Sequence, residues 1–360
     1  MQIGAKCFLD EQLKTMITDQ ERFGDCEIQN QKDCIVYDTK KDNYLEEYLE
    51  EIIDVFTVAS HLGLKDQDSK TDYMRNYLKK WKLFSVDADE IQRIMVNICK
   101  ERYKDEPKLF EDKVIIREVV SPDEMNQKCI LKTYDWEAFC YNIKHVNRFH
   151  TDLVNFEQLK NLLGNMVIDI PKDTLRLFRS RICDEKHYIL GYKKSEMGAP
   201  PTEFTSSGRT NSEGIQCLYL ADKPETTFHE VRARDNDHVS VGEFRQKYDL
   251  RIIDFSLFDR MSPFLSTDFD ITWLAINMEI IRKIGDEIAK PMRRFDKDLD
   301  YVPTQYICDY VKHLGYDGIK YKSTLMEDGV NYAIFDQRKF ECVNVDVVTI
   351  ENVQYKYEKL

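Results

Sequence analysis

The segment from residue 176 to residue 230 contains side chains that could bind an anion and stabilise a cation. Arg179 and Arg181 lie in LFRSR, where the alternation of a strand would project both side chains from one face. Arg209 follows in SSGRTNSEG, a loop with two glycines. Guanidinium groups pair with phosphate oxygens, so these arginines could clamp a pyrophosphate. The loop lacks the Walker and GxGxxG patterns, and taken alone it indicates only a polar turn before a strand.

Four other side chains could complete such a site, and each also has a purely structural interpretation. Glu230 ends PETTFHE, where it is either a solvated helix carboxylate or the stabiliser of a developing positive charge. Tyr219, in CLYLAD, either packs in the core with its hydroxyl bonded or lies flat against a ligand ring. Ser323 directly follows a β-like run, and Asn331 begins the next one. A serine in that position is usually a turn residue.

The elements that must position these side chains are short strands with a few helices between them. Runs with strand character occur at 174–182, 215–221, 250–256, 318–323, 331–336 and 342–350. Two longer helical patterns lie at 273–288 and 304–314. The second half of the chain is therefore predicted to be a mixed α/β domain.

The first half has a different character. Helical periodicity predicts helices at 43–64, 72–84, 87–103 and 135–149, separated by charged loops. Gly164 and Pro171 punctuate the change to strand-like runs. The sequence thus predicts an α+β protein with a helical domain over 1–165 and a mixed α/β domain over 166–360.

Composition excludes some classes of function. The formal net charge of −13 argues against a protein that coats nucleic acid, so any anionic ligand must be drawn by a few well-placed arginines. No apolar run is long enough to span a membrane, and the N-terminus has no signal-peptide pattern. The chain carries 10 scattered cysteines, which we expect to be reduced in the cytoplasm.

The order of these motifs resembles the RES domain family, which is named for an arginine, a glutamate and a serine. The resemblance extends from LFRSR through SSGR, GIQCLYLADKPETTFHE and LGYDGIKYKS to NYAIFD, over most of residues 172–337. It implies a fold related to the ADP-ribosyltransferases, and the first half resembles a HEPN-like helical region. The residues it marks as catalytic are Arg179, Arg209, Glu230 and Ser323, and those it marks as ligand-binding are Arg181, Tyr219 and Asn331.

The resemblance implies an enzyme that degrades NAD as a bacterial toxin or defence effector. NAD would be the substrate, and no cofactor is expected. A carboxylate suits the oxocarbenium ion that forms when the nicotinamide–ribose bond breaks, and arginines suit the pyrophosphate. The sequence leaves the acceptor open among water, phosphate and a macromolecule, so ADP-ribosyl transfer is one alternative. A catalytically inactive, partner-binding module is another, although intact signature residues argue against it.

The helical half is expected to restrain the enzyme through an antitoxin or sensor protein, and homo-oligomerisation stays open. Cys7, Cys26 and Cys34 raise the question of zinc, but their spacing is too wide for a CxxC knuckle, so no metal is predicted. The arginine–histidine spacings at 181–187 and 232–238 match that of HEPN ribonucleases but lie outside the helical half. We therefore do not expect the helical half to be a nuclease.

Overall fold

The computed structural model describes residues 1–64, 70–265, 269–290 and 297–354. The chain divides into two compact units that interleave along the sequence. Unit 1 consists of Met1–Trp136, Asp152–Leu159 and Arg260–Lys283, and unit 2 consists of Glu137–Thr151, Lys160–Asp259 and Ile284–Leu360. The division of the chain at residue 165 stays a prediction.

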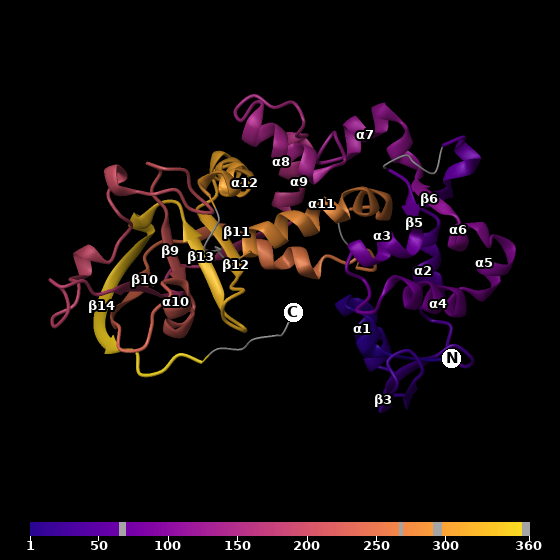
Figure 1. The fold of residues 1–360 in the computed structure, drawn as a ribbon, viewed down its shortest axis with the longest axis horizontal. Coiled ribbons are helices and arrows are strands. Elements are labelled where there is room, and N and C mark those ends of the chain that lie inside the picture. Colours follow the sequence, from indigo (N-terminus) through magenta and orange to yellow (C-terminus); the bar gives the residue numbers. More distant parts are fainter. Residues whose placement is uncertain (65–69, 266–268, 291–296, 355–360) are drawn as a thin grey trace. The chain divides into compact units, whose positions relative to one another are not determined.

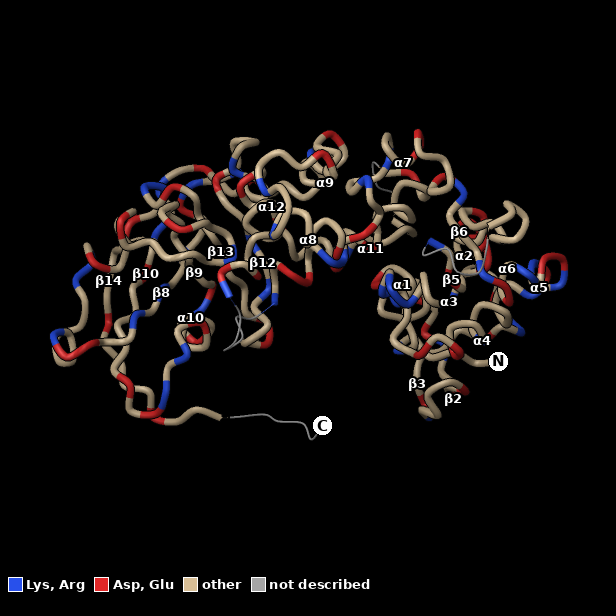
Figure 2. The backbone as a smooth tube through the Cα atoms, turned by 45° about the horizontal axis from the view of Figure 1, so that its top comes forward, with Lys and Arg blue, Asp and Glu red and all other residues tan. Residues whose placement is uncertain are grey.

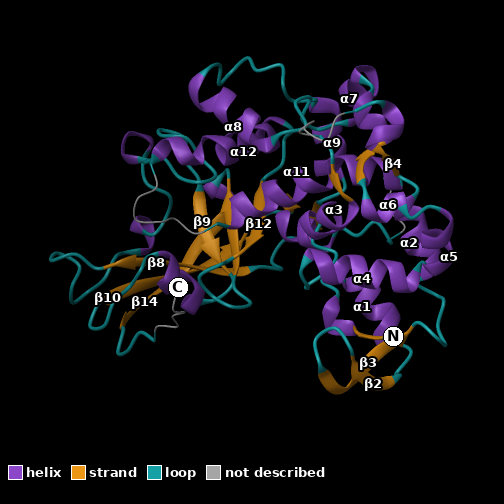
Figure 3. Cartoon of the chain, turned by 45° about the vertical axis from the view of Figure 1, so that its right-hand side comes forward, coloured by secondary structure: helices purple, strands orange, loops and turns teal. Residues whose placement is uncertain are grey.

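Unit 1 combines short helices with two small antiparallel sheets. Its helices are α1 (Glu11–Thr18), α2 (Glu46–Ile53), α3 (Met74–Lys80), α4 (Ala88–Ile98), α5 (Lys100–Asp105), α6 (Lys108–Glu111) and α7 (Pro122–Lys128). Its strands are β1 (Gln2–Gly4), β2 (Phe23–Cys26), β3 (Gln31–Asp38), β4 (Phe56–Val58), β5 (Asp72–Tyr73) and β6 (Lys113–Ile116). Within the described residues, the strands pair in the orders β1-β3-β2 and β4-β6-β5. Figure 3 shows both sheets beside the helices.

The helices of unit 1 follow sequence signals, whereas its sheets depart from the helical expectation. Asp87 begins α4 by accepting a hydrogen bond from the Glu90 amide at 3.0 Å, and the isoleucine side of α4 is buried. The run at 43–64 is not one helix, because α2 ends at Ile53 and β4 begins at Phe56. β-branched residues such as Val58 favour that change to a strand.

Unit 2 is built on one mixed sheet. Its strands are β7 (Val167–Ile170), β8 (Arg176–Ile182), β9 (Leu218–Ala221), β10 (His238–Gln246), β11 (Leu250–Asp254), β12 (Gly318–Lys322), β13 (Val330–Ile334) and β14 (Phe340–Thr349). In the described residues their order is β14-β10-β8-β9-β13-β12-β11-β7. The β11–β12 pair is parallel, and the other neighbouring strands are antiparallel. Figure 1 shows this sheet with α10 against it.

Further helices lie wholly or partly in unit 2. They are α8 (Trp136–His145), α9 (Phe156–Gly164), α10 (Pro224–Glu230), α11 (Ile271–Ala289) and α12 (Val302–His313). The α11 helix is continuous, but its residues up to Lys283 belong to unit 1 and those from Ile284 belong to unit 2. None of the helices in the described parts of the chain is apolar over a length that could cross a membrane.

Alternation along the strands separates an apolar face of the sheet from the face that bears the candidate site. Leu218 and Leu220 of β9, with Tyr332 and Ile334 of β13, point into one buried apolar cluster. Their neighbours Tyr219 and Asn331 therefore project from the opposite face. Charged residues of both signs are interspersed along the backbone of both units (Figure 2). The candidate site thus lies on the face of the sheet opposite the apolar cluster, where Tyr219 and Asn331 project.

Candidate functional site

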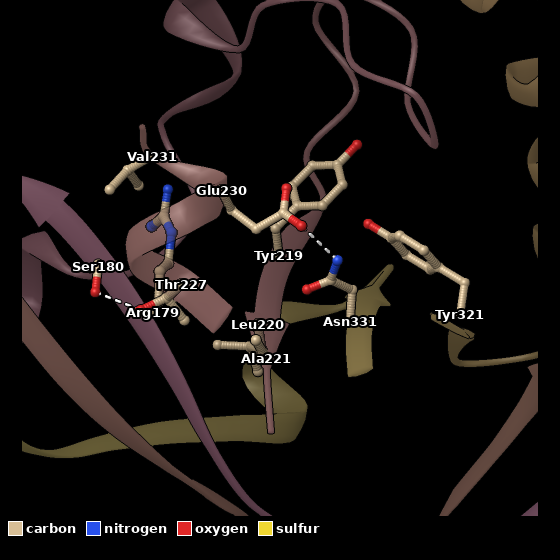
Figure 4. A pocket seen from close by; sticks show the side chains of 10 residues that line it. All are labelled: Arg179, Ser180, Tyr219, Leu220, Ala221, Thr227, Glu230, Val231, Tyr321 and Asn331. Atoms are coloured by element: carbon tan, nitrogen blue, oxygen red, sulfur yellow. Dashed lines mark hydrogen bonds between the residues drawn. The ribbon is translucent and has the colours of Figure 1, made fainter. Parts of the chain in front are cut away.

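A pocket of about 250 Å³ opens where β8 and β9 separate. Within the described chain, these strands pair only where Phe178 faces Ala221. The pocket is lined by residues of β8, β9, α10, β12 and β13 and by the residue after α10: Arg179, Ser180, Tyr219, Leu220, Ala221, Thr227, Glu230, Val231, Tyr321 and Asn331 (Figure 4). Because pairing with β9 stops after Phe178, the next residues of β8 can face a ligand on that side while they stay paired with β10 on the other.

The short helix α10 carries Glu230 into this pocket. Pro224 is favoured in the first turn of a helix, and the side chain of Thr227 is bonded both to the Pro224 carbonyl (2.6 Å) and to Ser180 of β8 (2.5 Å). Before the helix, Asp222 accepts a hydrogen bond from the Val330 amide at 3.0 Å, which ties the segment to β13. These contacts fix α10 against the sheet, and its last residue is Glu230.

One oxygen of the Glu230 carboxylate is held by two side chains from adjoining parts of the sheet. Asn331 Nδ2 donates to Glu230 Oε1 at 2.7 Å, and Ser323 Oγ donates to the same oxygen at 3.2 Å. Asn331 is buried, whereas Glu230 is exposed. No described residue hydrogen-bonds the second oxygen, Oε2. The carboxylate is therefore oriented by one oxygen and can offer the other to a ligand.

Arg179 and Arg181 project toward the same loop, as strand alternation predicts. Arg179 donates from Nη1 to the carbonyls of Met197, at 2.7 Å, and Gly198. Arg181 donates to the Glu196 carbonyl at 2.5 Å. Burial, and secondarily the charge of Arg181, lower the pKa of Arg179 to about 10, so Arg179 stays cationic at neutral pH. Arg179 lines the pocket, whereas Arg181 is not among the lining residues.

Arg209 lies outside the lining of the pocket, in a loop that α12 holds. Its Nη1 donates to the Ile288 carbonyl at 2.8 Å, and its own carbonyl accepts a hydrogen bond from Thr304 at 2.8 Å. Gln305 donates to the Gly208 carbonyl, also at 2.8 Å. A Cβ at Gly208 would lie 2.7 Å from the Tyr219 hydroxyl, so a side chain there would displace the tyrosine.

Tyr219 combines the two roles that its sequence position left open. Its ring lines the pocket, while its hydroxyl is bonded within the loop that carries Arg209. The hydroxyl accepts from Thr210 Oγ1 at 2.7 Å and donates to Asn211 Oδ1 at 2.6 Å. Burial raises the pKa of this phenol well above its usual range. Tyr219 thus joins the wall of the pocket to the loop.

The structure adds residues that the motif order did not indicate. Ser180 and Thr227 hold α10 against β8, and Tyr321 lines the pocket from β12. In the register of the sheet, Tyr321 lies opposite Asn331, on the side of β12 that faces the pocket. A signal for Tyr321 was available, since it precedes Ser323 by two residues and alternation places both on one face.

The cysteines near the N-terminus come together without forming a recognisable metal site. Cys7 Sγ and Cys26 Sγ are 3.6 Å apart, and both residues are buried. The Gly4 amide donates to Cys26 Sγ at 3.2 Å. Among the described residues, no group of three or more His, Cys, Asp or Glu side chains is arranged to hold a metal ion. No residue of the pocket belongs to such a group either.

The pocket therefore offers one oriented carboxylate, one half-buried cation and two tyrosines. Of the residues expected in the site, the lining brings together Arg179, Tyr219, Glu230 and Asn331, and Ser323 touches Glu230. Chemically, the carboxylate can stabilise a cation or accept a proton from a hydroxyl, and the guanidinium can bind an anionic oxygen.

Comparisons with known proteins identify the family of the chain. The RES domain family matches residues 176–358, and the chain belongs to this family. No curated protein is similar enough to the chain to count as a match. Among solved structures, a chain of the M. tuberculosis MbcT–MbcA toxin–antitoxin complex is similar with 14% sequence identity and a TM-score of 0.32, over 53% of this chain and 91% of that chain. The HEPN-like character of the first half stays a prediction.

Proposed function

We propose that the protein cleaves the bond between nicotinamide and ribose in NAD. The observation that carries this proposal is the Glu230 carboxylate, which is exposed to the pocket and held through Oε1 by Asn331 and Ser323. A carboxylate with one oxygen fixed is preorganised to stabilise the positive charge of a ribosyl oxocarbenium ion. Membership of the RES domain family supports the same choice of substrate.

In the proposed reaction the bond from ribose C1′ to the pyridinium nitrogen breaks. Both electrons of that bond go to the nitrogen, so nicotinamide leaves as a neutral molecule and needs no acid. Glu230 stabilises the cation left on the ribose, while Arg179, cationic at neutral pH, binds a phosphate oxygen of the substrate. Water or inorganic phosphate then attacks C1′, and a proton is released when the attacking group is water.

In the cell we propose that this activity makes the protein a toxin or defence effector that depletes NAD. A protein that consumes an abundant metabolite must be restrained, so we further propose an antitoxin or sensor protein as its partner. Unit 1 would provide the regulatory surface for that partner. A partner can control the enzyme if it binds the active and inactive states with different affinities.

The decisive experiment is product analysis with purified protein. NAD is incubated with and without phosphate, and nicotinamide, ADP-ribose and ADP-ribose 1″-phosphate are separated by chromatography. Release of nicotinamide by the wild type, but not by Glu230→Gln, supports the proposal. Label from [³²P]NAD that accumulates on protein or nucleic acid would instead indicate ADP-ribosyl transfer. Intact NAD with every acceptor would refute cleavage.

A further inference from the structure

Tyr321 presents an unusual hydroxyl to the pocket. The side chain is 6% exposed and lines the pocket from β12. Its hydroxyl points toward Asn331 and the Glu230 carboxylate (Figure 4). Within the described residues no hydrogen-bond partner meets this hydroxyl, whereas the hydroxyl of Tyr219 has three polar contacts. The two tyrosines of the pocket therefore differ in function, because one hydroxyl is bonded within the protein and the other is available.

The hydroxyl of Tyr321 belongs to the lining of the pocket, so solvent or a ligand group can hydrogen-bond it there. Phenylalanine would fill nearly the same volume on β12 but would offer no hydrogen-bonding group to a ligand. A ligand group that hydrogen-bonds Tyr321 would replace solvent at this position when the pocket is occupied.

The electrostatic surroundings indicate which kind of ligand group fits. Burial raises the pKa of Tyr321; the positive charge of Arg209 opposes this shift, and the negative charge of Glu230 adds to it. The phenol thus stays neutral and can both donate and accept a hydrogen bond. The phenol is influenced by the positive charge of Arg209, which suits a phosphate, and by the negative charge of Glu230, which suits a ribose. A neutral phenol between these two charges is suited to hydrogen-bond an uncharged hydroxyl group of the ligand.

We propose that Tyr321 is a substrate-contacting residue that hydrogen-bonds a hydroxyl of the ribose at the reacting bond and so selects an intact ribose. This inference rests on the proposed cleavage of NAD. Glu230 Oε2 would accept from one hydroxyl of the ribose diol, and Tyr321 would bond the other. The pocket would then recognise the sugar through two groups, one from α10 and one from β12.

The test compares Tyr321→Phe with the wild type on NAD and on two analogues whose nicotinamide ribose lacks either the 2′- or the 3′-hydroxyl. On NAD we expect the variant to lose about tenfold in kcat/KM, the scale of one hydrogen bond. On the analogue that lacks the contacted hydroxyl, the two enzymes should differ by less than about twofold, since the bond is already absent. Comparing both enzymes on each substrate cancels the intrinsic reactivity of the analogue.

Tyr332→Phe is the matched control. Tyr332 lies on the neighbouring strand β13 and is 7% exposed, but its side chain belongs to the apolar cluster on the other face of the sheet. Removal of the Tyr332 hydroxyl should leave kcat/KM unchanged on all three substrates. Melting temperatures of both variants establish that they are folded. If the Phe variant does not fold, Tyr321→Met supplies the same deletion of the hydroxyl.

Two results would overturn the inference. One is a folded Tyr321→Phe protein with wild-type kcat/KM on NAD, and the other is an equal loss on NAD and on both analogues. Calorimetry with NAD separates this inference from the proposed function. If the wild type binds NAD without cleaving it and Tyr321→Phe binds at least about threefold more weakly, Tyr321 contacts the ligand and only the cleavage proposal fails. If NAD is neither bound nor cleaved, both fail.

Discussion

Asn331 donates a hydrogen bond of 2.7 Å to the Oε1 atom of Glu230, across the boundary between strand β13 and helix α10. The two residues are 101 positions apart in the sequence. Asn331 is 5% exposed, so its amide is fixed by the sheet before any ligand arrives. The carboxylate is therefore held in place by a rigid donor, which favours stabilisation of charge without rearrangement.

Replacing Glu230 with glutamine should abolish most of the activity and leave the fold intact. The substitution keeps the shape of the side chain but removes the negative charge, so turnover of NAD should fall by at least about 100-fold. Glu225→Gln is the control, because Glu225 lies exposed in the first turn of the same helix and does not line the pocket. Near-wild-type turnover by folded Glu230→Gln would exclude this carboxylate from the mechanism.

The two donors to Glu230 should differ in importance. Asn331→Ala removes the shorter, buried hydrogen bond and should lower kcat by about tenfold, whereas Ser323→Ala should lower it by about threefold. In both variants KM should change less than kcat, because the bond orients the carboxylate for the transition state. Steady-state kinetics measures both quantities. A larger effect for Ser323→Ala than for Asn331→Ala would contradict the ranking.

Arg179 should contribute to binding of the substrate more than to stability. Arg179→Ala should weaken NAD affinity at least about tenfold, and Arg179→Lys should also bind poorly because an ammonium lacks the paired donors of guanidinium. Arg209→Ala should weaken binding as well, through its charge near the pocket. Arg176→Ala is the control and should bind normally, because Arg176 is an exposed residue of β8 that is paired with Glu243 and does not line the pocket. Calorimetry that finds unchanged affinity in both Arg179 variants would contradict an anion-binding role.

The Cys7–Cys26 pair should form a disulfide under mild oxidation. Burial raises the pKa of the Cys7 thiol. At Cys26 burial acts in the same direction, but hydrogen bonds from the amides of Gln29, Gly4 and Ile28 outweigh it, so the pKa of the Cys26 thiol is lowered. Cys26 is then the attacking thiolate, so the rate of oxidation by hydrogen peroxide should rise with pH and level off at a lower pH than for an ordinary thiol.

Peptide mapping by mass spectrometry identifies the linkage between Cys7 and Cys26. The reaction is two thiols and one peroxide giving one disulfide and two waters. Cys26→Ser should prevent formation of this disulfide, and Cys34→Ser should not. A dominant Cys26–Cys34 linkage in the wild type would show that the thiol contact does not determine the product.

A fragment that begins near Pro171 should fold poorly despite containing the whole family match. Residues Arg260–Lys283 fall within that match but belong to unit 1. There, Asn277 accepts from the Ile130 amide at 2.8 Å, and Trp273 donates to Gln158 at 2.7 Å. The fragment should therefore be insoluble alone and recover when residues 1–170 are co-expressed as a separate chain. Soluble, cooperative unfolding of the fragment alone would contradict this expectation.

The strands that carry the site could be predicted from alternation, while their neighbours in the sheet could not. The segments at 174–182, 318–323 and 331–336 contain β8, β12 and the greater part of β13. β10 was missed because Gly242 interrupts its apolar pattern. Most strands of the small sheets in unit 1 were missed because strands of two to four residues, such as β4, are too short to show a period. β3 has eight residues, but its buried positions are consecutive and do not alternate.

Motif order indicated most of the site residues, yet it could not supply their partners. The family pattern pointed to Glu230 and Asn331, but only the fold shows that one holds the other. Alternation with Ser323 placed Tyr321 on the same face, but its register with Asn331 is a property of strand pairing and appears only in the fold. The contact of Arg209 with the Ile288 carbonyl likewise joins distant segments, and local periodicity carries no information about it.

The interleaving of the two units also determines when the protein can complete its folding during synthesis. Domains usually fold from the N-terminus while the ribosome is still translating. Unit 1 includes Arg260–Lys283, so it cannot complete its core until that segment has left the ribosome. Unit 2 needs β12 and β13, which are made later still and bring Tyr321 and Asn331. A nascent chain therefore has no assembled pocket until β12 and β13 have left the ribosome, and the proposed restraining partner would have that interval in which to bind before the pocket forms.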